Sequence, residues 1–144
     1  MLILLRRRMA RGNERRRLRR FWVRQIFGER KEKGEYHTLV KETMIFDHEY
    51  VFRMFRMSPT KYETFLQWLA PFLVRSNVRR EAISPGERLR VTLRFLVTGD
   101  AFATIAHSYR MSETTVGRIV KDTCEIIWNV LKDRGFLKVP ENQN

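Results

Sequence analysis

Apolar residues recur every three or four positions through most of the chain after residue 45, which is the spacing of one face of a helix. No stretch shows the strict alternation of a half-buried strand, and no internal repeat is present. We therefore expect an all-α fold. The predicted helices cover residues 35–45 and 48–57, a segment from Pro59, a segment from Pro85, residues 101–107, and a segment from 113 to about 135.

Capping residues mark where several of these helices begin. Ser58-Pro59 and Ser84-Pro85 each place a capping hydroxyl before a proline at the first helical position. Glu87, three residues after Ser84, completes the pattern of a capping box. Asp47 is expected to cap the helix over 48–57, and Gly99 to end the helix that starts at Pro85.

The last three predicted elements have the order of a helix-turn-helix. A short helix over 101–107 is followed by a turn over 108–111 and by a long helix that Ser112 caps. In such a unit one face of the last helix packs on its neighbours, while its polar N-terminal end enters the major groove of DNA. The candidate DNA contacts of this unit are Arg110, Ser112, Thr114, Thr115, Arg118 and Lys121.

Each of these side chains suits a particular kind of contact. The planar fork of Arg118 matches the two acceptors on a guanine edge, and Thr114 and Thr115 suit a thymine methyl group or a phosphate. Arg110 and Lys121 suit phosphates, which position a helix without reading sequence. Three short amphipathic helices also occur in small bundles that bind no DNA, so the spacing alone leaves both interpretations open.

Charge favours the DNA-binding interpretation. The 144 residues carry a net charge of +13. Residues 1–33 hold thirteen Lys and Arg against three Asp and Glu, whereas the remainder holds sixteen against thirteen. A segment this basic favours a polyanion, with nucleic acid as the commonest partner and an anionic membrane surface as the rival. The candidate phosphate contacts in its densest part are Arg15, Arg16, Arg17, Arg19 and Arg20.

The uneven charge divides the chain into a small helical bundle with a basic N-terminal arm and a C-terminal helix-turn-helix. The expected regions are a basic arm (1–33), a helical packing region (34–82), a helix-turn-helix domain (83–138) and a tail (139–144). The arm also resembles a nuclear-import signal, which predicts a nuclear location, although a solvated tail is the alternative. Its bulky residues are expected to dock it on the bundle: Phe21, Trp22, Val23, Ile26 and Phe27.

Little in the sequence indicates catalysis or membrane insertion. His37, His48 and His107 are scattered, without a second ligand at metal-binding spacing. The single cysteine, Cys124, fits a small core residue. No stretch approaches the roughly 20 apolar residues of a membrane span, and the short apolar start precedes its arginines, the reverse of a secretory signal. We expect no catalytic site, cofactor, metal, membrane contact or small-molecule substrate.

A series of short motifs spans residues 21–140. They include Trp22-Val23-Arg24, Gly34-Glu35-Tyr36-His37, Phe52-Arg53-Met54-Phe55-Arg56-Met57-Ser58-Pro59, Thr92-Leu93-Arg94-Phe95-Leu96, Ser108-Tyr109-Arg110 and Leu137-Lys138-Val139-Pro140. In this order the motifs resemble the N-terminal region of PIF/Harbinger transposases, including the Harbinger transposase-derived nucleases and the plant ALP-like proteins. No single motif is diagnostic, and the resemblance rests on the ordered series.

The resemblance implies a DNA-binding role within a nuclease family. In that family the helix-turn-helix contacts transposon ends, a Myb-like DNA-binding protein is a partner, and an RNase H-like core with three acidic metal ligands follows. The sequence stops at Asn144, close to where that core would begin, so we expect a truncated form without the core or its divalent metal. The alternatives are part of a longer metal-dependent nuclease, or a protein-interaction module in which residues 35–74 bind the partner through an apolar patch. The patch, or else core packing, would involve Phe52, Phe55, Trp68 and Phe72.

Overall fold

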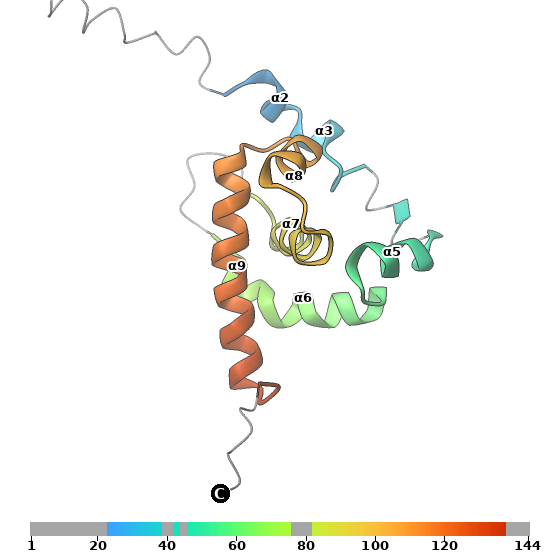
Figure 1. Cartoon of the computed structure of the whole chain (residues 1–144), viewed down its shortest axis with the longest axis vertical. Coiled ribbons are helices and arrows are strands. Elements are labelled where there is room, and N and C mark those ends of the chain that lie inside the picture. Colours follow the sequence, from blue (N-terminus) through green and yellow to red (C-terminus); the bar gives the residue numbers. More distant parts are fainter. Residues whose placement is uncertain (1–22, 39–41, 44–45, 76–81, 138–144) are drawn as a thin grey trace, which may run out of the picture.

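The computed structural model describes residues 23–38, 42–43, 46–75 and 82–137, which form seven helices and no strand. The all-α class is therefore confirmed for this part of the chain. The helices are α2 (Gln25–Gly28), α3 (Arg30–Lys33), α5 (His48–Phe55), α6 (Pro59–Leu73), α7 (Pro85–Thr98), α8 (Phe102–Tyr109) and α9 (Glu113–Asp133). In Figure 1, α7 is seen nearly end-on at the centre, with α9 along one side and α6 below it.

The helix starts follow the capping residues, as the sequence predicts. The side chains of Asp47, Ser58 and Ser84 each accept a hydrogen bond from the backbone N–H three residues further on, at 2.9, 3.4 and 3.2 Å. These bonds satisfy donors that the first turn of a helix leaves without an intrahelical partner. Gly99 ends α7 in the left-handed conformation, with φ of +67°.

Several predicted boundaries differ from the observed ones, and the local geometry at two of them is clear. Residues 35–38 form a turn where the sequence predicts the start of a helix over 35–45. The N–H groups of His37 and Thr38 both donate to the carbonyl of Gly34, and the N–H of Glu35 donates to the carbonyl of Ser108, so this turn is tied to α8. The helix predicted over 48–57 ends at Phe55, because Arg56 adopts a left-handed conformation with φ of +55°.

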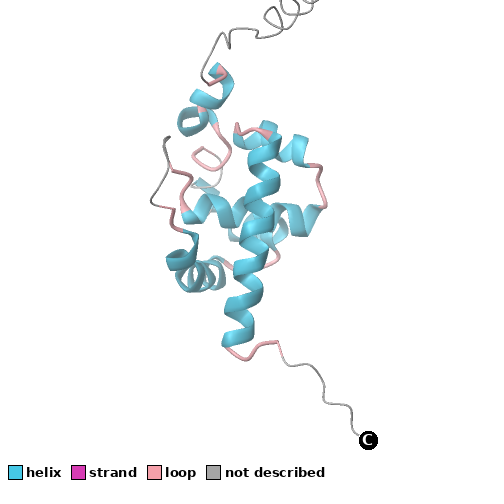
Figure 2. Cartoon of the chain, turned by 90° about the vertical axis from the view of Figure 1, so that its left-hand side faces the viewer, coloured by secondary structure: helices cyan, strands magenta, loops and turns pink. Residues whose placement is uncertain are grey.

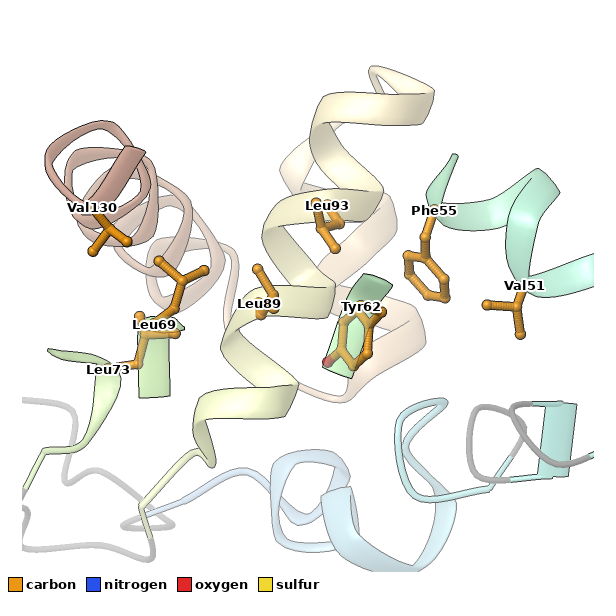
Figure 3. Close-up of a cluster of buried hydrophobic side chains, with 8 residues drawn as sticks. All are labelled: Val51, Phe55, Tyr62, Leu69, Leu73, Leu89, Leu93 and Val130. Carbon is orange, nitrogen blue, oxygen red and sulfur yellow. The ribbon is translucent and has the colours of Figure 1, made fainter. Parts of the chain in front are cut away.

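One hydrophobic cluster lies between α5, α6, α7 and α9. Figure 3 shows side chains of α5, α6 and α9 gathered around α7. Its buried members are Val51, Phe55, Tyr62, Leu69, Leu73, Leu89, Leu93 and Val130. Of the predicted apolar patch, Phe55 is thus core and only 4 % exposed, while Phe52 and Phe72 remain 52 % and 62 % exposed.

A second cluster lies between α7, α8 and α9. Its buried members are Val91, Ile105, Ala106, Tyr109, Met111, Val116, Ile119 and Val120, and Cys124 packs half-buried against them. Both clusters take residues from α7 and α9, so these two helices join the α5–α6 pair to α8. Cys124 accordingly behaves as a small packing residue, and burial raises the pKa of its thiol.

Charged residues are buried along the first half of α7. Every residue from 86 to 93 is buried, including Glu87, Arg88 and Arg90. The guanidinium carbon of Arg90 lies 4.6 Å from the ring centroid of Tyr62, and its Nε donates to the Tyr62 hydroxyl at 3.2 Å. That hydroxyl in turn donates to the carbonyl of Gly86 at 3.1 Å. Cation–π and hydrogen-bond contacts therefore hold this arginine inside the core.

The buried Tyr62 hydroxyl predicts a loss of stability at alkaline pH. Burial raises its pKa from 10.0 to about 12, against the opposing effect of Arg90. Above pH 10 the unfolded chain loses this proton while the folded chain keeps it. The free energy of unfolding should therefore fall by about 2–3 kcal/mol between pH 10 and 12 because of this residue.

Urea unfolding followed by circular dichroism at several alkaline pH values measures this loss. Tyr62→Phe lacks the ionisable group, so its stability should decline less steeply over the same range, whatever its stability at neutral pH. Tyr109, whose pKa burial also raises, contributes to the slope in both proteins. Parallel declines in the two proteins would contradict the assignment.

Candidate nucleic-acid interface

The helix-turn-helix begins with α8 and reverses at Arg110. This residue has φ of +52°, in the left-handed region, which ends α8 and turns the chain. Ser112 then starts α9, because its Oγ accepts a hydrogen bond from the backbone N–H of Thr115 at 3.2 Å. The predicted order of helix, turn and capped helix is therefore present, with α8 extending to Tyr109, two residues beyond its expected end.

The inner side of this unit is closely packed. Ile105 and Tyr109 of α8 are buried in the second cluster together with Val116 and Ile119 of α9. At Gly117, a Cβ atom would lie 3.4 Å from the ring of Phe102, so α8 approaches the N-terminal half of α9 closely. The helices are thus held against one another along one face of α9, and the opposite face is left for solvent.

The outer side of α9 carries most of the predicted contact residues. Thr114, Arg118 and Lys121 are exposed, and their spacing of four and three places them in one stripe along the helix. Figure 2 views α9 from the side that faces away from α7. Within the described chain, no carboxylate forms an ion pair with Arg118 or Lys121. Both cations therefore face solvent, and no carboxylate of the described residues neutralises them.

The remaining predicted contacts of the unit are engaged inside the protein. Ser112 and Thr115 are half-buried, and their hydroxyl oxygens lie 2.7 Å apart at the start of α9. Arg110 is also half-buried, with Nη1 2.9 Å from Oε2 of Glu29. The two hydroxyls thus support the helix start, and the turn arginine already has an anionic partner.

That partner belongs to the end of the basic arm, which docks beside the turn. α2, α3, α8 and the N-terminal end of α9 lie at one end of the molecule, opposite the C-terminal end of α9 (Figures 1 and 2). Arg30 forms an ion pair at 3.0 Å with Glu87, and only 11 % and 2 % of their side chains are exposed. Nε2 of His37 lies 3.8 Å from the same carboxylate oxygen.

A second ionic contact holds the chain just after α3. Glu35 pairs with Arg94, which also donates from Nε to Asp100 at 3.2 Å. Burial alone would lower the pKa of Arg94, but these carboxylates raise it instead. Charged side chains therefore contribute to docking, which the sequence did not predict. Of the apolar residues predicted to dock, Val23 and Phe27 are half-buried, whereas Ile26 is 37 % exposed.

The predicted phosphate contacts of the arm (Arg15, Arg16, Arg17, Arg19 and Arg20), together with Phe21 and Trp22, lie outside the described residues. Sequence reasoning missed Glu29 and Lys33, whose side chains pair at 3.1 Å. Opposite charges four residues apart are a recognisable pattern of a helical ion pair, so this contact could have been predicted. Nothing in the sequence links Glu29 to Arg110.

Among the residues that the structure describes, no group of three or more His, Cys, Asp or Glu side chains could hold a metal ion. None of the helices within this part is both long enough and apolar enough to cross a bilayer.

Comparison with known proteins gave no match. No protein-family model, curated protein or solved structure matches this chain. The geometry of α8 and α9, the distribution of charge and the order of the sequence motifs are therefore the observations that bear on function.

The buried Arg30–Glu87 pair predicts that the arm contributes to stability. In Arg30→Ala, Glu87 would keep a buried charge without its guanidinium partner, which typically costs about 3 kcal/mol. The free energy of unfolding, measured by urea titration, should fall by about that amount. Arg24→Ala is the matched control, because Arg24 is exposed and should change stability by less than about 0.5 kcal/mol. Equal stabilities of the two variants would show that the docking is unimportant.

Proposed function

We propose that this chain is the DNA-binding helix-turn-helix module of a Harbinger-type transposase-derived protein that acts in the nucleus. The observation that carries the proposal is the outer stripe of α9, where Thr114, Arg118 and Lys121 face solvent directly after a capped helix start. The proposed family rests on the ordered motifs that resemble the N-terminal region of Harbinger transposases. The positive charge of the basic arm favours a polyanion such as DNA as the partner.

The stripe suits the major groove of duplex DNA. An α-helix with its side chains is about 10–12 Å wide, which matches a groove about 12 Å wide. Arg118 would read a guanine edge with its bidentate fork, while Lys121 would neutralise a phosphate. Glu113 is also exposed at the helix start, and it would disfavour close approach of a phosphate at that point.

The arm would contribute most of the electrostatic affinity. It holds most of the net positive charge, and neutralising phosphates releases bound counterions from DNA. The ion pairs of Arg30 and Glu35 fix the base of the arm beside α8 and the start of α9. The arm and the stripe would therefore contact the same stretch of duplex. The arm would contact phosphates, and the stripe would contact both phosphates and bases.

The proposed role of this chain is to bind DNA, without a chemical step of its own. Nuclease activity would belong to an acidic core of the kind that follows this region in Harbinger proteins. If the chain works within a longer metal-dependent nuclease, its task would be to hold the DNA for that core.

Exposed aromatic side chains favour a second candidate function, binding of a protein such as a Myb-like partner. Phe52 and Phe72 are more than half exposed, as are Trp128 and Phe136 near the far end of α9. Large exposed aromatic groups are typical of protein interfaces. A pull-down that retains a Myb-like protein, combined with absence of duplex binding, would favour this function over the first.

The first prediction of the DNA-binding proposal is a steep dependence on salt. If about four phosphates are neutralised, affinity for duplex DNA should fall roughly a hundredfold between about 50 and 200 mM salt. Fluorescence anisotropy with a labelled duplex of random sequence measures this dependence. Affinity that hardly changes over this range would contradict phosphate binding.

A second prediction separates base reading from phosphate contact. Selection from random duplexes first defines the preferred sequence. Arg118→Ala should then cost about 1–3 kcal/mol on that sequence and much less on others, because a base contact is lost. Lys132→Ala is the matched control, because it also removes one positive charge from α9. Lys132 is exposed near the other end of the helix, so this variant should keep the sequence preference of the wild type.

The arm provides the complementary comparison. Replacing Arg16 and Arg17 by alanine should weaken binding to all sequences alike and lower the salt slope by about two. If Arg118→Ala also weakens all sequences equally, its assignment as a base-reading residue is wrong.

A further inference from the structure

One carboxylate at the α8–α9 turn is shared by two cations. Oε2 of Glu29 lies 3.1 Å from Nζ of Lys33 and 2.9 Å from Nη1 of Arg110. Lys33 comes from α3, whereas Arg110 comes from the turn that leads into α9. Two positive groups from distant parts of the chain therefore converge on a single anionic oxygen.

This arrangement is partly open to solvent. The side chains of Glu29 and Arg110 are 27 % and 26 % exposed, and that of Lys33 is 56 % exposed. An ion pair with this exposure contributes only a small free energy, because water and salt screen it. A stronger or more highly charged anion arriving from outside could therefore replace the carboxylate.

We propose that Lys33 and Arg110 form a phosphate subsite for duplex DNA, which Glu29 occupies in the free protein. Arginine and lysine are the usual phosphate ligands, and one phosphate oxygen can accept hydrogen bonds from both, as Oε2 of Glu29 does. The inference rests on the proposed function, since it adds a site and a competitor to the same interface. It also adds Lys33 to the residues that contact DNA.

The position of the subsite agrees with this role. Arg110 stands two residues before Ser112, so the subsite adjoins the end of α9 that would enter the groove. Because α3 and α8 lie at that same end (Figure 1), a duplex in contact with Thr114 would bring its backbone close to the turn. Glu29 would then face that backbone with a like charge, which favours its displacement.

Contacts other than those of Glu29 also anchor the end of the arm. Arg30 is anchored by its buried pair with Glu87, and Glu35 is anchored by Arg94 and by its backbone bond to Ser108. Both anchoring residues follow Glu29 in the sequence, and their contacts involve neither Lys33 nor Arg110. Neutralising Glu29 should therefore free two cations without undocking α3.

The test compares Glu29→Gln with Glu32→Gln, using a random-sequence duplex and fluorescence anisotropy at about 100 mM salt. Both variants lose one negative charge from the same segment, but Glu32 is exposed and lies in α3 outside the shared contact. Glu29→Gln should bind about threefold more tightly than Glu32→Gln, as expected for removal of a partly exposed competing pair. The preferred sequence should stay the same, because phosphates carry no base information.

A second pair of variants tests the cations directly. Lys33→Ala should weaken binding about threefold more than Lys61→Ala, which removes an exposed lysine from α6. Thermal melting of each variant checks that the bundle is intact. The subsite is contradicted if the wild type binds DNA in a salt-dependent manner but Glu29→Gln binds no more tightly than Glu32→Gln. If the wild type does not bind duplex DNA at all, the proposed function fails and the subsite fails with it.

Discussion

The enclosure of α7 is the constraint on which the rest of the structure depends. α5, α6, α8 and α9 all pack against this helix, and its residues from 86 to 93 are buried without exception. Three of these residues are charged, and a buried charge is costly unless a partner compensates it. Glu87 forms an ion pair with Arg30 of the arm, and Arg90 makes cation–π contacts with the rings of Tyr36 and Tyr62. The docking of the arm is thus a consequence of burying this helix.

What the sequence could predict was local. The caps at Ser58, Ser84 and Ser112 depend on side chains three residues from their partners, so their pattern is readable without a structure. The exposure of Arg118 and Lys121 follows from the same helical periodicity that buries Val116 and its neighbours. For these reasons the all-α class and the outer face of α9 were predictable, whereas their role in DNA binding stays a proposal.

What the sequence could not predict involves charges that meet across long separations. A charged residue on an amphipathic helix is expected to face water, yet Arg90 lies inside the core because aromatic rings from three other segments surround it. Arg30 and Glu87 are 57 positions apart, and Glu29 and Arg110 are 81 apart. No periodicity connects such pairs, so the docking of the arm and the engagement of the turn arginine appear only in three dimensions.

The ring of Phe102 rests on α9 at Gly117. A Cβ atom at this position would lie 3.4 and 3.5 Å from two atoms of that ring, which is ordinary van der Waals contact. Alanine would therefore fit here with little or no shift of α8. Because glycine inside a helix is about 0.5–1 kcal/mol less favourable than alanine, a single added methyl group at this point would strengthen the longest helix of the molecule and keep its contact with α8.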